Sequence, residues 1–278
     1  MSDIVLSAGV RANLLQLQQT STLITQTQTK LATGKRVNSA LDNPINFFTA
    51  QGLDNRASDL TNLLDSMSTA INTIQAANNG ITSITKLVQS AQALVSQAQQ
   101  TSDTTVRSGL ASQFDALLTQ IDTLAQDSGF NGINLLDKTN SPDLTVVLNE
   151  KSGTAQSSVT ISAVDFTHGA NGLAINNSAN NWAASTDITA ASTDLTAALT
   201  TLRSQSQAFG SNLSTVQIRQ DFTKAMINTL QTGSDSLTLA DSNQEGANLL
   251  ALQTRQQLST TALSLASQAS QAVLRLFQ

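Results

Sequence analysis

The sequence predicts a mainly α fold, a long antiparallel helical rod with terminal coiled-coil helices and a small β-hairpin insert. Apolar residues recur at seven-residue spacing near both ends of the chain and through its central segments, which is typical of helices that pack along a seam. Between those segments, one region alternates apolar and other residues as a β-hairpin does. Aromatic residues make up only 3% of the 278 residues and prolines number two, a composition that suits long helices in a thin rod.

The first helix is expected to run from about Ala8 to Leu31. Leu14, Ser21 and Gln28 are assigned to the offset positions of its apolar stripe. Because Ser21 and Gln28 are polar, this helix is expected to be weak in isolation and to depend on neighbouring chains for much of its order. The residues that recur every seven positions are Val10, Leu17, Ile24 and Leu31.

Two long helices are expected after a break at residues 33–36. Asn43 can cap the first of them, with Pro44 at its first helical position, and the pattern continues to about Gln100. The second is expected to begin near Thr104 and to end at the glycine-containing turn 129–132. The seam of the first comprises Leu60, Met67, Ile74, Ile81, Val88 and Val95, and that of the second comprises Leu110, Phe114, Leu117, Ile121 and Leu124.

A β-hairpin and a further rod helix are expected next. Apolar residues alternate along 144–148 and again along 159–163, on either side of a turn at 151–153, which predicts two antiparallel strands. Helix is expected to resume around Thr193 and to continue through residue 230. Gly210 lies within it, and we expect this glycine to allow close helix packing.

The last helix is expected to be the second terminal coiled-coil helix, complementary to the first. Its seam is assigned to Leu258 and Leu265 together with Leu276, and the charged Arg255 weakens it. Alanines accompany these leucines in the seam, and larger residues flank it. The alanines are Ala251, Ala262, Ala269 and Ala272, and the flanking residues are Leu252, Leu263, Val273 and Phe277.

Composition and motifs exclude several classes of function. The formal net charge is -5 with no segment rich in Lys or Arg, which argues against nucleic acid. Cysteine is absent, so thiolate chemistry does not contribute. The one histidine, His168, has no ligand or base cluster near it, no His-Glu-x-x-His occurs, and Gly34-Lys35-Arg36 lacks the remainder of a P-loop. We therefore expect no enzyme activity, no catalytic or metal-binding residue and no cofactor.

The sequence carries no sign of a membrane or secretory segment. Its first eleven residues contain no positively charged leader and no apolar run of signal-peptide length, and no stretch is long enough to span a bilayer. Composition alone therefore predicts a soluble cytoplasmic protein without a membrane contact.

Three segments resemble the bacterial flagellin family, in the order in which that family carries them. Residues 31–43 are similar to its N-terminal motif, residues 130–136 to the turn after its second rod helix, and residues 240–277 to its C-terminal signature. The short middle region resembles that of a short flagellin without a large outer domain. The family-motif residues are Gly34, Arg36, Asn38, Asp42, Phe130, Asn131, Gly132, Arg255 and Gln256.

The resemblance implies a structural subunit that polymerises into the extracellular bacterial flagellar filament, the propeller for swimming motility. It also implies secretion by type III export without a cleaved signal peptide, which replaces the cytoplasmic expectation. The implied partners are other copies of this chain in a helical homopolymer, an export chaperone, the type III flagellar export apparatus, and the filament cap and hook-junction proteins. The residues implied to assemble the filament core are Val10, Leu14, Leu17, Ile24, Leu31, Leu258, Leu265, Leu276 and Phe277.

By the same resemblance, three domains are expected. The domains are a terminal helical inner-tube domain of residues 1–43 and 235–278, a helical rod domain of residues 44–137 and 193–234, and a short β-containing variable insert of residues 138–192.

The resemblance also bears on immune recognition. Gln89 and Ala91 stand where flagellins recognised by an immune receptor carry arginines, so recognition by that receptor is not expected.

Two alternative functions stay open. A hook-filament junction protein shares both terminal motifs but acts as a short adaptor ring. A cytoplasmic signalling coiled coil shares the Gln- and Ala-rich seams, yet it leaves the hairpin unexplained and forms dimers without growth into filaments. Electron microscopy distinguishes these alternatives from a filament protein.

Overall fold

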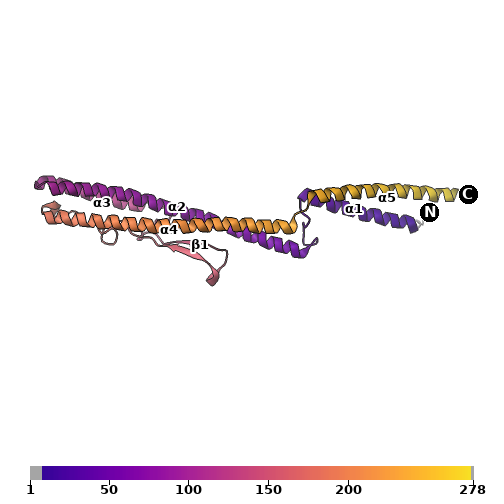
Figure 1. Ribbon diagram of the computed structural model, residues 1–278, viewed down its shortest axis with the longest axis horizontal. Coiled ribbons are helices and arrows are strands. Elements are labelled where there is room, and N and C mark those ends of the chain that lie inside the picture. The colour runs from indigo at the N-terminus through magenta and orange to yellow at the C-terminus, as the bar shows by residue number, and fades with distance from the viewer. Residues whose placement is uncertain (1–7, 277–278) are drawn as a thin grey trace. The chain divides into compact units, whose positions relative to one another are not determined.

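The structure is a computed structural model that describes residues 8–276, apart from the side chains of residues 270 and 273–276 (Figure 1). The described chain is mainly α-helical with one small antiparallel sheet, so the predicted fold class is confirmed. None of its described helices combines the length and the hydrophobicity needed to cross a bilayer. The α-helices are α1 (Ala8–Thr33), α2 (Pro44–Gln100), α3 (Thr104–Asp127), α4 (Ser185–Thr238) and α5 (Ser242–Leu276), the strands are β1 (Leu144–Val147) and β2 (Ser158–Ile161), and short 3-10 helices are η1 (Gly153–Ala155) and η2 (Ala179–Trp182).

The chain forms two compact units. One consists of residues 1–56 and 228–278, and the other of residues 57–227. We call them the terminal unit and the central unit. Helices α2 and α4 contribute to both, because each continues past the boundary between the units. The division into three domains, with an insert of its own, stays a prediction.

The starts of α2 and α3 lie where capping residues occur in the sequence. Pro44 is the first residue of α2, and the Asn43 Oδ1 atom accepts a hydrogen bond from the Asn46 backbone N at 3.0 Å. At the start of α3, the Asp103 carboxylate accepts from the Thr105 backbone N at 2.8 Å. Such caps satisfy backbone donors that have no partner inside the helix. The expected starts of both helices are confirmed.

Helix α4 begins at Ser185, so the expected start at Thr193 is wrong. Ile188 is fully buried and continues the buried face of the helix toward its N-terminus. Buried Arg107 of α3 also holds this end, since its Nη1 atom donates to the Ala183 carbonyl at 3.3 Å and its Nη2 atom to the Ser185 Oγ atom at 3.4 Å. The Ser, Thr and Ala residues here show only a weak helical periodicity, so tertiary contacts decide where the helix begins.

The core of the central unit follows the seams of α2, α3 and α4, which lie alongside one another in Figure 1. The predicted seam residues of α2 are all buried, and so are Phe114 and Ile121 of α3, while the other predicted seam residues of α3 are half-buried. Trp182, the one tryptophan of the chain, packs against Phe114 with the ring centroids 5.0 Å apart. Each buried Leu, Ile or Phe contributes about 1.5–3 kcal/mol. These contacts give the central unit a continuous core of its own.

β1 and β2 pair as an antiparallel hairpin, as predicted. Leu144 pairs with Ile161, and both are buried in the central core together with Val146. The predicted turn falls within a longer connecting loop, where Gly153 has a φ of 65°. That left-handed conformation favours glycine, so the sequence located the turn correctly but not the length of the loop.

Two glycines of the central unit differ in their surroundings. A Cβ atom added to Gly210 would meet nothing within 4 Å, so the expectation that this glycine allows close helix packing is wrong. Gly80 of α2 makes the close approach instead. A Cβ atom there would lie 2.6 Å from the Leu136 Cδ1 atom and would also overlap the Ser128 side chain. The segment after α3 therefore packs directly on the α2 backbone at Gly80.

Candidate assembly surface

Helices α1 and α5 of the terminal unit pack along each other (Figure 1), which confirms that the two terminal helices are complementary. Burial along α1 repeats in steps of three and four residues, as in a heptad seam. The predicted heptad residues Val10, Leu17, Ile24 and Leu31 all lie half-buried in this seam. Asn13, Thr20 and Thr27 are the positions between them.

The predicted offset positions of the α1 seam are wrong. Leu14, Ser21 and Gln28 are exposed, whereas Thr20 is only 1% exposed. In a heptad seam the second residue can lie three positions after the first. The residue four positions after the first then points about 100° away from that second residue, out of the seam. Thr20 is tolerated inside the seam because its Oγ1 atom donates to the Gln16 carbonyl at 2.8 Å.

The predicted seam of α5 faces away from α1. Leu258 and Leu265 are 67% and 62% exposed, and the alanines assigned to the same seam are exposed as well. Leu252 and Leu263, assigned to the flank, are half-buried instead. Both stripes repeat at heptad spacing, so the pattern alone does not say which one meets the partner helix. The half-buried stripe of α5 comprises Leu249, Leu252, Gln256, Ser259, Leu263 and Ala266.

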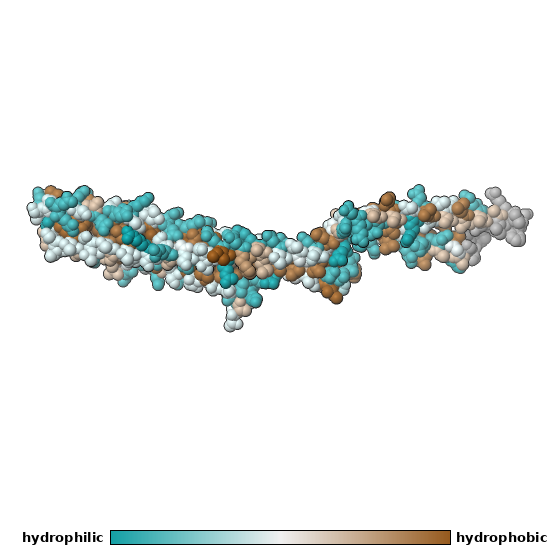
Figure 2. All heavy atoms as spheres, in the orientation of Figure 1, coloured by the Kyte–Doolittle hydropathy of each residue, from teal (hydrophilic) through white to brown (hydrophobic). Residues whose placement is uncertain are grey.

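Helix α5 consequently presents a second apolar stripe to solvent, which we call the outer face of α5. Figure 2 shows apolar residues among polar ones on the visible surface of the terminal unit. Leu250 lies beside this face and is 67% exposed. The side chain of Leu276 and the whole of Phe277 lie outside the described residues. The outer face comprises Ala251, Leu258, Ala262, Leu265, Ala269 and Ala272.

The motif residues Gly34 and Arg36 bond the segment after α1 to the end of α4 and the residues just after it. Gly34 has a φ of 68°, a left-handed conformation that favours glycine, and its carbonyl accepts from the Ala240 backbone N at 2.9 Å. The Arg36 backbone N donates to the Thr238 carbonyl at 2.8 Å. The Arg36 Nη2 atom donates to the Leu237 carbonyl at 3.3 Å, so the guanidinium caps the last turn of α4.

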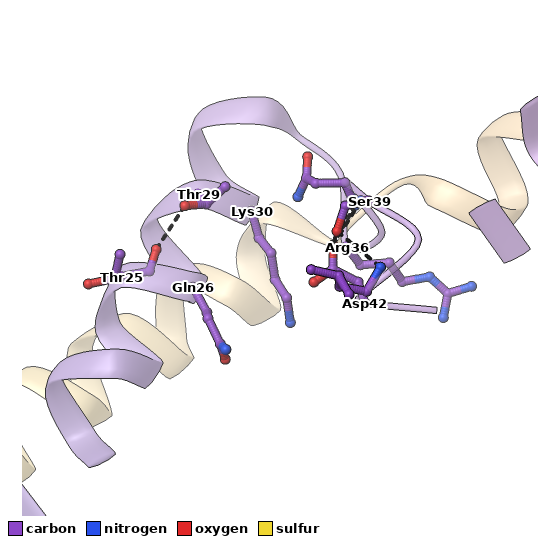
Figure 3. Close-up of a pocket in the computed structure, with 9 residues that line it drawn as sticks. Thr25, Gln26, Thr29, Lys30, Arg36, Ser39 and Asp42 are labelled. Carbon is purple, nitrogen blue, oxygen red and sulfur yellow. Dashed lines mark hydrogen bonds between the residues drawn. The ribbon is translucent and has the colours of Figure 1, made fainter. Parts of the chain in front are cut away.

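The Asp42 carboxylate closes the loop between α1 and α2 (Figure 3). Its Oδ2 atom accepts from the backbone N of Asn38 at 2.9 Å and of Ser39 at 3.0 Å, and from the Ser39 Oγ atom at 3.2 Å. These backbone hydrogen bonds, with a smaller effect from the charge of Lys30, lower the pKa of Asp42 below its ordinary value. Asn38 also donates from its Nδ2 atom to the Lys35 carbonyl at 2.9 Å. The motif residues Asn38 and Asp42 therefore act together.

A groove of about 550 Å³ lies between α1 and this loop (Figure 3). Its two cations have partners, since the Lys30 Nζ atom lies 3.4 Å from the Glu245 Oε1 atom and Arg36 caps α4. Within residues 8–276, no group of three or more His, Cys, Asp or Glu residues is placed to hold a metal ion. The groove is therefore a polar contact region between α1 and the loop that follows it. Its lining residues are Thr25, Gln26, Thr29, Lys30, Arg36, Asn38, Ser39, Leu41 and Asp42.

The Phe130-Asn131-Gly132 motif forms a tight turn after α3. Asn131 and Gly132 have φ values of 50° and 81°. The Phe130 backbone N donates to the Ile133 carbonyl at 2.8 Å, and the Ile133 backbone N donates back at 3.0 Å. Two successive positive φ values are typical of a type I′ turn, which favours Asn-Gly. The motif thus reverses the chain so that it returns toward the central core.

Asn134 is a residue that sequence reasoning missed. Its Nδ2 atom donates to the Ala125 and Gln126 carbonyls, both at 2.8 Å, and its Oδ1 atom accepts from the Leu136 backbone N at 2.9 Å. The side chain satisfies carbonyls at the end of α3 that have no partner in the helix. An isolated amide within the apolar run 133–136 was the signal that the sequence offered.

The two motif residues of α5 lie in different surroundings. Gln256 is half-buried in the stripe that packs on α1. Arg255 is exposed, so its predicted place in the seam is wrong, and it lines a groove of about 360 Å³ together with Leu23 of α1 and Glu245 of α5. A long charged side chain can cover such an apolar edge while its guanidinium stays in water.

His168 has a charged partner, which the sequence did not reveal. Its ring Nδ1 atom lies 2.7 Å from the Asp122 Oδ2 atom, and its backbone N donates to the Asp122 Oδ1 atom at 2.7 Å. Asp115 holds Ser178 in the same way, by its backbone N at 2.8 Å and its Oγ atom at 2.7 Å. The segment after the hairpin is thereby fastened to α3. Asp122 is 46 residues away in the sequence, so the sequence did not indicate this partner.

Comparisons with known proteins agree with the motifs. Residues 8–141 match the family described as the bacterial flagellin N-terminal helical region. Flagellin FljM of Caulobacter vibrioides is 30% identical over 279 residues, covering 100% of this chain and 99% of the relative, and a flagellin of Brucella melitensis is 26% identical over 286 residues, covering 100% of both. The crystal structure of Bacillus cereus flagellin is 22% identical, with a TM-score of 0.47 over 58% of this chain and 88% of that one. Because a flagellin with 30% identity spans the whole chain, the protein belongs to the bacterial flagellin family.

Proposed function

We propose that α1 and α5 build the inner tube of a flagellar filament and that the outer face of α5 joins neighbouring copies. As a flagellin, the protein is a structural subunit that polymerises into the bacterial flagellar filament, the propeller for swimming. The observation that carries the assignment of the joining surface is that α5 has two apolar stripes and α1 covers only one of them.

The outer face of α5 is rich enough in leucine to drive association. Leu250, Leu258 and Leu265 are all more than half exposed, and burying a leucine contributes about 1.5–3 kcal/mol. Association costs about 4–15 kcal/mol in lost translational and rotational freedom, so one leucine does not hold a subunit. Leu258 and Leu265 of this stripe act together with Leu250 beside it, and the alanines of the stripe allow close approach of a neighbouring helix. Leu15 and Leu23 of α1 are exposed as well.

The terminal unit is proposed to gain much of its order from this contact. The seam between α1 and α5 contains Asn13, Thr20, Gln256 and Ser259, so it buries less apolar area than an all-leucine seam. We expect hydrogen exchange of the monomer to be faster in both terminal helices than in the buried seams of the central unit. Equal protection in the monomer would show that the terminal unit needs no neighbour.

The central unit is proposed to form the wall around the tube. The proposed rod comprises residues 44–137 and 193–234, which add the adjoining ends of α2 and α4 to the central unit, and residues 138–192 are assigned to a short insert on its outer surface. The support is that the predicted seam of α2 and the aromatic core of α3 are buried within the subunit itself. A rod with a complete core can keep its shape while subunits rearrange around it.

Membership of the family supports a proposal for export and location. We propose that the filament is extracellular and that the chain leaves the cell through the type III flagellar export apparatus, with an export chaperone covering its apolar stripe beforehand. A filament cap and hook-junction proteins are the proposed partners at the two ends of the polymer. The proposed role is purely structural, with no catalytic residue, metal or cofactor.

The assignment is tested by Leu265→Asp. A carboxylate in the middle of the outer face should abolish growth from filament seeds, because burying an unpaired charge is costly. The control is Gln253→Asp, another exposed position of α5, which should polymerise normally. Sedimentation and electron microscopy measure growth, and Trp182 fluorescence reports whether the central unit is still folded. Filaments of Leu265→Asp at the usual protein concentration would contradict the role of the outer face.

Electron microscopy of the unmodified chain also addresses the alternative as a hook-filament junction protein. Long uniform filaments from seeds are the expected result. Short rings that stop growing under all conditions would favour the junction protein, and stable dimers would favour a signalling coiled coil. The full-length relatives named above are flagellins, which supports the filament.

A further inference from the structure

Residues 41–48, at the start of α2 and just before it, include large apolar side chains that nothing in the described chain covers. Leu41 is 96% exposed, Ile45 is 77% exposed and Phe48 is 60% exposed. The only ring near Phe48 in the described chain is that of its neighbour Phe47, with the centroids 5.5 Å apart. We call these three residues the α2 patch. Large apolar side chains gathered at such exposure mark an interaction site.

A second apolar surface lies on α4, in the central unit. Ile218 is 66% exposed and Phe222 is 56% exposed. They are one helical turn apart, so they point in the same direction. We call this pair the α4 patch. Each patch has a phenylalanine and at least one branched aliphatic side chain, and each is small, so neither is a large interface alone.

Each rim contains one charged group that carries the argument, Asp42 beside the α2 patch and Arg219 beside the α4 patch, and these two are opposite in sign. Beside the α2 patch, Asp42 receives its three hydrogen bonds at the Oδ2 atom, which leaves the Oδ1 atom to accept from another molecule. Lys30 and Arg36, which line the same groove, are engaged by Glu245 and by the end of α4. The Asp42 carboxylate is therefore the charged group of this rim that can accept a hydrogen bond from a partner.

The rim of the α4 patch carries the matching cation. Arg219 is exposed between Ile218 and Phe222 in the sequence, and no ion pair within the described part of the chain includes it. Its neighbour Lys224 lies 3.5 Å from the Asp221 Oδ1 atom, so that charge is partly neutralised. The guanidinium of Arg219 presents N–H donors suited to a carboxylate.

We propose that in the filament the α2 patch of one copy packs on the α4 patch of a neighbouring copy, with Arg219 beside Asp42. This proposal rests on the proposed function, since it names a second contact between copies. Two different patches that fit each other form a heterologous contact, and a heterologous contact that does not close into a ring generates an open helical polymer. A filament needs such a contact, whereas a patch that pairs with itself produces a dimer.

Thiol crosslinking tests the pairing, because the chain contains no cysteine. Phe48→Cys and Phe222→Cys are combined in one chain, which is mixed with about an equal amount of unmodified chain so that seeds grow and many neighbouring copies both carry the two thiols. A short bismaleimide then links thiols that lie side by side. The double variant should give crosslinked dimers and higher multimers in filaments but not in monomer solution. Each single variant should give none, because every contact would then hold one thiol.

Two results would overturn the pairing. Filaments of the double variant without crosslinked products would show that the patches do not meet. A second double variant, Ile45→Cys with Ile218→Cys, is made in the same way and should likewise give no crosslinked products in that case. Dimers from either single variant would show a patch pairing with itself. The proposed function fails separately, when the unmodified chain grows no filament.

The charge at the rim is tested in the same filaments. Arg219→Glu should raise the protein concentration needed for growth about two- to five-fold, the range expected for an exposed ion pair. Arg203→Glu is the matched control, since Arg203 is an exposed arginine of the same helix, and it should leave that concentration unchanged. An equal effect of both variants would mean that net charge alone is responsible, and would remove Arg219 from the contact.

Discussion

Asp122 holds His168 at two points, with its Oδ1 atom 2.7 Å from the backbone N and its Oδ2 atom 2.7 Å from the ring Nδ1 atom. The aspartate lies on α3 and the histidine follows the hairpin, so one side chain fixes both the position and the rotation of the loop. The same two-point contact joins Asp115 to Ser178. The segment between β2 and α4 is thus fastened by helix carboxylates in addition to Phe166, Ile175 and Trp182, which are buried in the core of the central unit.

Asp122→Ala should loosen this loop. It removes the acceptor of a backbone N and of a ring nitrogen, and an unsatisfied polar group of this kind costs about 1–3 kcal/mol in the free energy of unfolding. Urea titration followed by Trp182 fluorescence measures the loss. The control Asp127→Ala removes an exposed carboxylate of the same helix and should change stability by less than about 0.5 kcal/mol. Equal losses from both variants would show that the contact to His168 contributes nothing.

The pH dependence of the terminal unit should include Asp42. Its pKa is lowered in the folded chain by the backbone hydrogen bonds from Asn38 and Ser39. A lowered pKa adds stability that is fully present above the ordinary Asp pKa of about 3.9 and is lost as the pH falls through the folded value. The melting temperature should therefore fall more steeply on acidification in the unmodified chain than in Asp42→Asn. The control is Asp54→Asn, and identical curves for all three proteins would contradict the prediction.

Gly80→Ala should destabilise the central unit. The added methyl group would lie 2.6 Å from the Leu136 Cδ1 atom, and overpacking of this kind typically costs about 1–3 kcal/mol. Gly210→Ala is the matched helix variant, because a Cβ there meets nothing within 4 Å, and it should stabilise by about 0.5–1 kcal/mol. Chemical denaturation measures both. Changes of the same sign would mean that helix propensity, and not the contact with Leu136, decides the effect.

Thr20→Val should strengthen the pairing of α1 with α5. Thr20 is 1% exposed in the seam, and valine replaces its hydroxyl with a methyl group of similar size, so the buried apolar area grows and the gain should be up to about 1 kcal/mol. Thr22→Val is the control, because the Thr22 hydroxyl also donates to a carbonyl of its own helix, at 3.1 Å, but the side chain is exposed. Faster hydrogen exchange in the Thr20 variant than in the unmodified chain would contradict this account of the seam.

Periodicity located the helices well because it reports a property of each helix alone. The starts of α2 and α3 follow from Asn43 and Asp103, whose side chains cap the residues next to them. The hairpin also follows from local alternation. Each of these features depends on residues close in sequence, so one sequence is sufficient to predict them.

The contacts between elements could not be predicted in the same way. Leu258 and Leu252 lie on two stripes of equal spacing, and only the position of α1 decides which one is covered. The start of α4 at Ser185 depends on Arg107, and the environment of His168 depends on Asp122, both distant in the sequence. The extra turns of α4 and the loop anchors therefore follow from tertiary packing.

The hydrogen bonds near Gly34 link the two connections that leave the terminal helices. A filament driven as a propeller carries torque, and the terminal pair of helices is joined to α2 and α4 by two short passages, residues 34–43 and 239–241. The Arg36 backbone N bonds Thr238 across one passage and the Ala240 backbone N bonds Gly34 across the other. Each passage is therefore bonded to the segment beside the other, so that a load on one connection is carried in part by the other.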